Sequence, residues 1–395
     1  MAASTTSHIL RQRLATQRLS SAPLPTPADV VGLLTCVQSQ ERDHAFFSLG
    51  MRSRTSTYAG VRAAYDSGTF LRTHILRPTW HFVRPEDLRW ILALTSPRVE
   101  ASMKGRHRRL GLDDDTHLGR ALDTICELLR DHRYLTRAEL AEELAARPGL
   151  PSAGQELGHV LLAAELRGLI VSAPLKGVHH TYALVDDVVP PQPEVDREEA
   201  LIRLVRRFFS GHGPASVKDF TRWSSLTVAD TRRALAEIGD GLQQTEVDGT
   251  PLWHDPEALP RRSTTAPSAY LFPVYDEAVL TYPALNFPSA LDHPHAARPD
   301  PFWAWVVVDE VNVGLWKRAV KADRVVVDVR LAPSVDRAGR AAVQAAAQRL
   351  ADFLERDLEY IESDGKPRLW GGDQGHPADR PRRAARAERS PAAGG

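Results

Sequence analysis

Apolar residues recur three and four positions apart from Val30 to Val37, a spacing typical of a helix with one buried face. Thr26 stands before this run as a possible N-cap, with Pro27 at the first helical position and Asp29 three residues after the cap. This arrangement predicts a capping box, in which the Thr and Asp side chains each bond the other's backbone N–H. We therefore predict a helix from Thr26 to Val37.

Two further helical patterns follow, from Glu41 to Met51 and from Tyr58 to Tyr65. Gly68 interrupts the pattern, and an extended segment continues from Phe70 to Val83. Within it, alternation puts Trp80 and Phe82 on one face and His81 on the other, and we expect Trp80 in the core. Helices followed by a hairpin form the outline of a winged helix.

This outline recurs after a connecting helical region. Thr136 and Glu139 predict a second capping box, and a further helix is expected from Gln155 to Arg167. Two β-rich stretches, LIVSAP and HHTYALV, come next, and the break between them contains Lys176 and Gly177, as the tip of a wing would.

A Pro-rich stretch at positions 190–193 marks a boundary, after which the outline appears a third time. Helices are predicted from Arg197 to Phe209, from Ser216 to Trp223 and from Val228 to Ile238, the last capped by Thr227. The stretches GLQQTEV and TPLWHD, joined through Asp248-Gly249, predict a closing hairpin.

From Tyr270 the pattern changes to strands, followed by a helix predicted from Arg337 to Tyr360. The predicted fold class is α+β, with three tandem winged-helix motifs and a C-terminal β-barrel-like domain. The predicted divisions are a first winged-helix unit with connecting helices at 1–112, a second unit at 113–189, a third at 190–262, a β-rich domain at 263–365 and a disordered tail at 366–395.

Composition adds little to this outline. The 395 residues contain 50 Lys and Arg and 50 Asp and Glu, so the formal net charge is zero. Any DNA contact therefore requires basic residues gathered on one face. Cys36 and Cys126 lie far apart and outside any metal-ligand pattern, which favours two reduced thiols. We found no signal peptide or run long enough to span a membrane, and expect a cytoplasmic monomer without cofactor or metal.

Two basic clusters are candidates for phosphate contact. The first is predicted as a loop, and the second lies on the predicted recognition helix of the third unit. Their members are Lys104, Arg106, His107, Arg108 and Arg109 in the first, and Arg232 and Arg233 in the second. A solvated charged loop, and pairing of one helical arginine with an acidic neighbour, are the alternatives.

Three stretches, VQSQERDHAFFSLGMR, RPTWHFVRPEDLRW and HGPASVKDFTRWSSLTVADTRRALAEI, resemble the winged-helix family of the AlkZ and YcaQ DNA glycosylases. YLFPVYDEAVL resembles the start of the family's C-terminal barrel. The resemblance implies three winged helices and a barrel around a basic DNA channel, and removal of bulky or crosslinking N7-alkylpurines, in some members as self-resistance to DNA-alkylating antibiotics. It also implies a DNA-approaching loop between Tyr282 and Phe302, which here holds His293, His295 and Arg298.

The family's catalytic motif is Gln, a usually aliphatic residue, then Gln or Asp. Here Gln38, Ser39 and Gln40 stand at these positions, with a small polar residue in the middle. Side chains two apart diverge on a helix but share a face in an extended segment, so the catalytic interpretation requires the helix to end just after Val37. Otherwise the two glutamines are ordinary polar residues at a helix end.

Two neutral amides can catalyse base removal only if the base leaves without being protonated by the protein. An N7-alkylpurine is already cationic and leaves without a general acid, so the protein need only position water and stabilise charge on the sugar. The alternative functions are a transcriptional regulator or adaptor that binds DNA without catalysis, and a scaffold that binds proteins. No GxSxG, HExxH or P-loop pattern points to another hydrolase.

Overall fold

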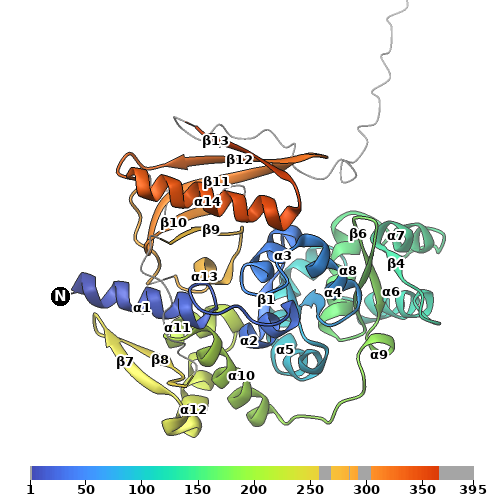
Figure 1. The fold of residues 1–395 in the computed structure, drawn as a ribbon. Coiled ribbons are helices and arrows are strands. Elements are labelled where there is room, and N and C mark those ends of the chain that lie inside the picture. The colour runs from blue at the N-terminus through green and yellow to red at the C-terminus, as the bar shows by residue number, and fades with distance from the viewer. Residues whose placement is uncertain (1, 258–267, 284, 292–303, 364–395) are drawn as a thin grey trace, which may run out of the picture.

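The protein has a mixed α+β fold, described by a computed structural model over residues 2–257, 268–283, 285–291 and 304–363 (Figure 1). The helices are α1 (Ala2–Thr16), α2 (Pro27–Leu34), α3 (Arg42–Gly50), α4 (Tyr58–Asp66), α5 (Pro85–Arg109), α6 (Asp115–Leu128), α7 (Arg137–Ala145), α8 (Gly154–Leu166), α9 (Val185–Val188), α10 (Arg197–His212), α11 (Val217–Ser224), α12 (Val228–Ile238), the 3-10 turn η1 (Gly239–Gly241), α13 (Glu277–Leu280) and α14 (Arg337–Leu354).

The strands are β1 (Cys36–Gln38), β2 (Leu71–His74), β3 (Trp80–Val83), β4 (Leu135–Thr136), β5 (Ile170–Lys176), β6 (His179–Leu184), β7 (Gln243–Val247), β8 (Thr250–His254), β9 (Ala269–Leu271), β10 (Ala304–Val308), β11 (Val311–Val320), β12 (Arg324–Leu331) and β13 (Asp357–Glu362). Among the helices that the structure describes, none is long and apolar enough to cross a lipid bilayer.

The helix starts follow the predicted capping residues. Both predicted capping boxes are present, at Thr26 before α2 and at Thr136 before α7, and Thr227 caps α12 through the backbone N–H of Asp230. Capping satisfies N–H groups that have no partner in the first helical turn. These local signals predicted the helix starts correctly because they depend on residues within one turn.

The end of α2 differs from the prediction. The helix stops at Leu34, and Thr35 adopts φ 66° and ψ −53°, close to the strained conformation at the centre of a classic γ-turn. Since Thr is β-branched and gives no sequence signal for such a turn, the predicted continuation to Val37 was wrong. The chain is therefore extended from Cys36, earlier than predicted.

Six strands form one antiparallel sheet in the order β1-β3-β2-β5-β6-β4. The hairpins predicted for the first two winged-helix outlines are joined in it through one pairing, Arg72 with Ser172. β1 adds to the outer edge of β3, which sets Gln38 opposite His81. The hairpin tips fall where predicted, with Gly177 at φ 66° and Gly249 at φ 75°.

α1 was not predicted from the sequence; it packs between the β7–β8 hairpin and the C-terminal sheet (Figure 1). Its Ile9 joins Val247 and Leu252 of the hairpin, while Leu10 and Leu14 join the sheet side chains. The apolar clusters are therefore shared between distant parts of the sequence.

The C-terminal strands form a sheet in the order β13-β12-β11-β10-β9, covered by α14 (Figure 1). α14 contacts both edge strands, β9 and β13, which requires the sheet to curl around it. The helix ends at Leu354, where Glu355 takes φ 53°, and the following strand β13 pairs parallel to β12. The predicted helix to Tyr360 was therefore too long, because a non-glycine left-handed residue gives little sequence warning. The tail predicted at 366–395 lies outside the described residues.

Candidate functional site

The motif glutamines lie where the chain leaves α2 and joins the first sheet. Gln38 is the last residue of β1 and is 8% exposed, whereas Gln40 is partly exposed. Ser39 between them is fully buried, and its backbone N–H donates to the carbonyl oxygen of Trp80 at 2.8 Å. The extended pairing thus continues through Ser39, the geometry that the catalytic interpretation requires.

Arg77 contacts the side chain of Gln38 from the turn between β2 and β3. Its Nη2 donates to Oε1 of Gln38 at 2.7 Å and to Nε2 of His81 at 3.1 Å. His81 in turn donates from Nδ1 to the carbonyl oxygen of Thr79 at 2.9 Å. Burial, and then the positive charge of Arg77, lower the pKa of His81 to about 3, so this ring is neutral at physiological pH.

Glu277, the first residue of α13, supports the backbone of the motif. Its Oε1 accepts the N–H of Gln38 at 2.9 Å, its Oε2 accepts the hydroxyl of Thr281 at 2.9 Å, and Nε2 of His212 lies 3.5 Å from Oε2. Burial alone would raise the pKa of Glu277, but His212, the charge of Arg77 and the Gln38 N–H together lower it to about 2. The Glu277 carboxylate therefore stays negatively charged next to the backbone N–H of Gln38.

A buried ion pair anchors the residue before Glu277. Arg52 and Asp276 are both fully buried and form two parallel bonds, Nη2 to Oδ1 at 2.7 Å and Nη1 to Oδ2 at 2.9 Å. Ser48 donates to the same Asp276 carboxylate at 2.7 Å. Two-pronged pairing with a carboxylate fixes orientation as well as distance, so α3 and the start of α13 are held in register.

The first basic cluster lies on a helix, not in the predicted loop. α5 continues to Arg109, so the cluster occupies its last turns, where positive charge interacts favourably with the helix dipole. Lys104, Arg108 and Arg109 are exposed, while Arg106 is partly buried and bonds Gln155 on α8. The sequence did not show that the helix continues through the cluster, because the buried positions of α5 end at Val99 and its last turns are polar.

The other predicted DNA-contact residues differ in their surroundings. Arg232 is exposed on α12. Arg233 on the same helix pairs with Glu198 at 2.9 Å and Asp230 at 3.0 Å, so acidic neighbours already neutralise it. Arg298 lies outside the described residues, together with the two histidines predicted near it.

Trp80 lines an open groove and is only partly buried, so its predicted core position was wrong in part. The groove encloses about 440 Å³ on the side of β3 opposite His81 and Gln38. Arg106 and Arg137 also line it, and the guanidinium of Arg72 lies 4.3 Å from the Trp80 ring centroid. The groove and the motif thus occupy opposite faces of the sheet.

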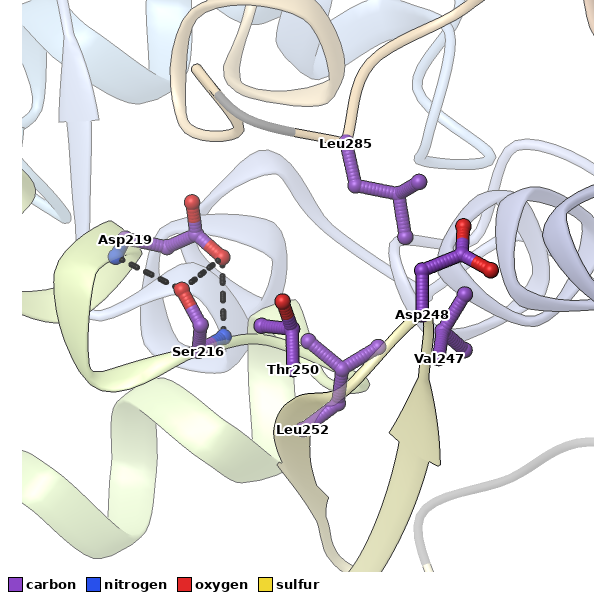
Figure 2. A pocket seen from close by; sticks show the side chains of 7 residues that line it. All are labelled: Ser216, Asp219, Val247, Asp248, Thr250, Leu252 and Leu285. Carbon is purple, nitrogen blue, oxygen red and sulfur yellow. Dashed lines mark hydrogen bonds between the residues drawn. The ribbon is translucent and has the colours of Figure 1, made fainter.

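A smaller pocket of about 120 Å³ lies between α11 and the β7–β8 hairpin (Figure 2). Ser216 and Asp219 lie at one side, bonded to each other as the capping box of α11, and Leu285 covers the hairpin side chains. Ligand pockets typically enclose about 300–1,000 Å³, so this space is too small for a nucleotide. Within the described ranges, no three His, Cys, Asp or Glu side chains are grouped as metal ligands would be.

A model of the DNA glycosylase AlkZ-like family matches residues 31–353. The chain belongs to the AlkZ-like DNA glycosylase family. The match includes the motif glutamines, Arg77, Glu277 and both basic clusters.

Two comparisons with proteins from Streptomyces sahachiroi agree with this assignment. An interstrand DNA cross-link repair glycosylase is 25% identical over 268 residues, covering 65% of this chain and 71% of the relative. The solved structure of the DNA glycosylase AlkZ matches with a TM-score of 0.72 and 22% identity, covering 90% of this chain and 99% of the other. The structural match supports the fold, and the sequence match supports the family.

Sequence spacing did not identify the residues that surround the motif in this AlkZ-like chain. Arg77 opens the stretch RPTWHF and Glu277 lies in YLFPVYDEAVL, both of which carry the family resemblance. The position of Glu277 within an otherwise apolar stretch was a signal that could have identified it, because a buried carboxylate requires partners. The contacts of Arg77 and Glu277 with Gln38 span long sequence separations and could not be inferred from spacing.

Proposed function

We propose that this protein is a DNA glycosylase that hydrolyses the N-glycosidic bond of bulky or crosslinking N7-alkylpurines in duplex DNA. The observation that carries the proposal is the extended geometry from Cys36 through Ser39, with Ser39 buried and Gln40 partly exposed. Two glutamines that flank a buried residue in an extended segment can address the same reacting atoms.

The reaction needs little acid–base chemistry from the protein. Water attacks C1′ of the deoxyribose as the C1′–N9 bond breaks, and the bonding electrons neutralise the cationic base. The departing alkylguanine is neutral, an abasic site remains, and the water proton passes to solvent. Gln38 and Gln40 position the water and offer amide dipoles to the charge that develops on the sugar.

We further propose that the helices and hairpins form three winged-helix units with the predicted boundaries, and that a barrel-like C-terminal domain follows them. The pairing of β2 with β5, which joins the first two hairpins, and the C-terminal sheet that α14 covers support this organisation. Duplex DNA would be bound by a monomer through exposed basic residues such as Lys104, Arg109 and Arg232. One role for such an enzyme is repair or self-resistance against DNA-alkylating natural products.

The alternative is a winged-helix protein that binds DNA without catalysis, such as a regulator. The fixed carboxylate and the Arg77 contact around Gln38 favour the enzyme, because binding alone does not require a rigidly held amide in a buried network. Family membership adds independent support.

The discriminating experiment incubates the purified protein with duplexes that contain N7-methylguanine or an N7-linked interstrand crosslink. Release of free base, with abasic sites that alkali cleaves, supports the glycosylase. Stable DNA binding without base release over many hours would favour the regulator instead.

A further inference from the structure

The structure determines which end of the Gln38 amide contacts the protein. Arg77 carries only N–H donors, so the Gln38 atom at 2.7 Å from its Nη2 must be the carbonyl oxygen Oε1. The other N–H of the same Nη2 is directed to Nε2 of His81. The amide of Gln38 is thus oriented by chemistry as well as by distance.

His81 keeps Arg77 in this position. Its Nε2 accepts from Arg77 only if Nδ1 carries the proton, which it donates to the carbonyl oxygen of Thr79. Because the pKa of His81 is lowered to about 3, the ring stays in this neutral form over the physiological range. Glu277 supplies the opposite charge that a largely buried Arg77 requires.

The remaining functional atom of Gln38 is its amide nitrogen. Oε1 is bonded to Arg77 and the backbone N–H to Glu277, whereas Nε2 has no protein acceptor among the residues that the structure describes. Gln38 retains 8% exposure at the end of β1. Arg77 already occupies one lone pair of Oε1, whereas both N–H groups of Nε2 are free of protein acceptors among the described residues, so the donors are the groups that the side chain most readily offers to a bound substrate.

We infer that Gln38 acts as the hydrogen-bond donor and Gln40 as the acceptor for one catalytic water, with Arg77 as the positioning residue that fixes this division. The inference rests on the proposed glycosylase function. Gln38 donates to one lone pair of the water, Gln40 accepts one of its protons, and the second lone pair is directed at C1′. Ser39 is buried between them and takes no part.

Gln38→Glu provides a sharp test, because Glu has nearly the same shape as Gln but has no N–H to donate. In Gln38→Glu the carboxylate pairs with Arg77 and presents only acceptors. We expect single-turnover release of 7-methylguanine at pH 8 to slow about 100-fold, the usual effect of removing one preorganised donor. The matched control Gln344→Glu makes the same change at an exposed position of α14, outside the motif, and should leave the release rate unchanged.

Arg77→Met and Arg77→Lys test the positioning role in the same assay. Arg77→Met frees the Gln38 amide to rotate and should lower the single-turnover rate about tenfold with unchanged DNA affinity, whereas Arg77→Lys retains a donor and should recover most of the rate. DNA affinity and the unfolding midpoint of each variant verify that it is folded.

The outcomes separate this inference from the proposed function. If the wild type releases base and Gln38→Glu releases it equally fast, the donor assignment is overturned. If the wild type releases base and Arg77→Met does so at an unchanged rate, the positioning role is overturned. Absence of base release by the wild type contradicts the proposed function itself.

Discussion

Oε1 of Glu277 accepts the backbone N–H of Gln38 at 2.9 Å, although 239 positions separate the two residues. The contact joins the start of α13 to the end of β1, so the C-terminal part of the chain helps to fix the candidate catalytic motif. Since the N–H of Gln38 is buried, loss of this acceptor would leave an unpaired donor beside the motif.

Glu277 should make stability depend on pH. Its pKa is about 2 in the folded protein and about 4.3 in an unfolded chain, so it contributes on the order of 3 kcal/mol above pH 4.3. This contribution is lost as pH falls from about 4.3 to 2. Glu277→Gln should therefore be less stable than wild type at pH 7, and the difference should shrink at pH 3, as measured by urea unfolding. An equal difference at both pH values would argue against a charged Glu277.

The buried pair of Arg52 and Asp276 should be important for stability. Arg52→Met leaves the Asp276 carboxylate buried without its partner, and breaking such a pair typically costs about 3–5 kcal/mol. Urea unfolding at pH 7 measures the loss. Arg324→Met is a matched control, since Arg324 and Glu359 form an exposed pair at a similar distance, and its effect should be far smaller. Equal losses in the two variants would contradict the importance of burial.

Phosphate contact by the end of α5 should appear as a salt dependence of DNA affinity. Each phosphate neutralised contributes about 0.9 to the slope of log affinity against log salt, so Lys104→Ala with Arg109→Ala should lower the slope by up to about 1.8. Arg233→Ala serves as the control, because Arg233 is already paired with Glu198 and Asp230. A slope unchanged in the double variant would place the DNA elsewhere.

The sequence predicted the features that depend on neighbouring residues. The caps at Thr26 and Thr136, and the hairpin tips at Gly177 and Gly249, all lie where they were expected. Each depends on side chains or backbone conformations within a few positions, which propensity and spacing report directly.

Features that leave no local signal in the sequence could not be predicted. Thr35 and Glu355 adopt positive φ without being glycine, and each ends a helix earlier than the apolar pattern suggested. Similarly, the resemblance to the AlkZ and YcaQ family identified Gln38 as a candidate site residue, but not its contacts with Arg77 and Glu277. Those contacts arise when the sheet and α13 are assembled, and no local periodicity encodes them.

The most direct test of catalysis by the two glutamines is the single-turnover rate of 7-methylguanine release by wild type, Gln38→Ala and Gln40→Ala. Each substitution should slow release without weakening DNA binding, and the double Ala variant should lose little more than the worse single variant, because the two amides hold one water. Gln40→Asp should retain activity, since a carboxylate also accepts from water. Wild-type release rates in both single Ala variants would contradict a catalytic role for the motif.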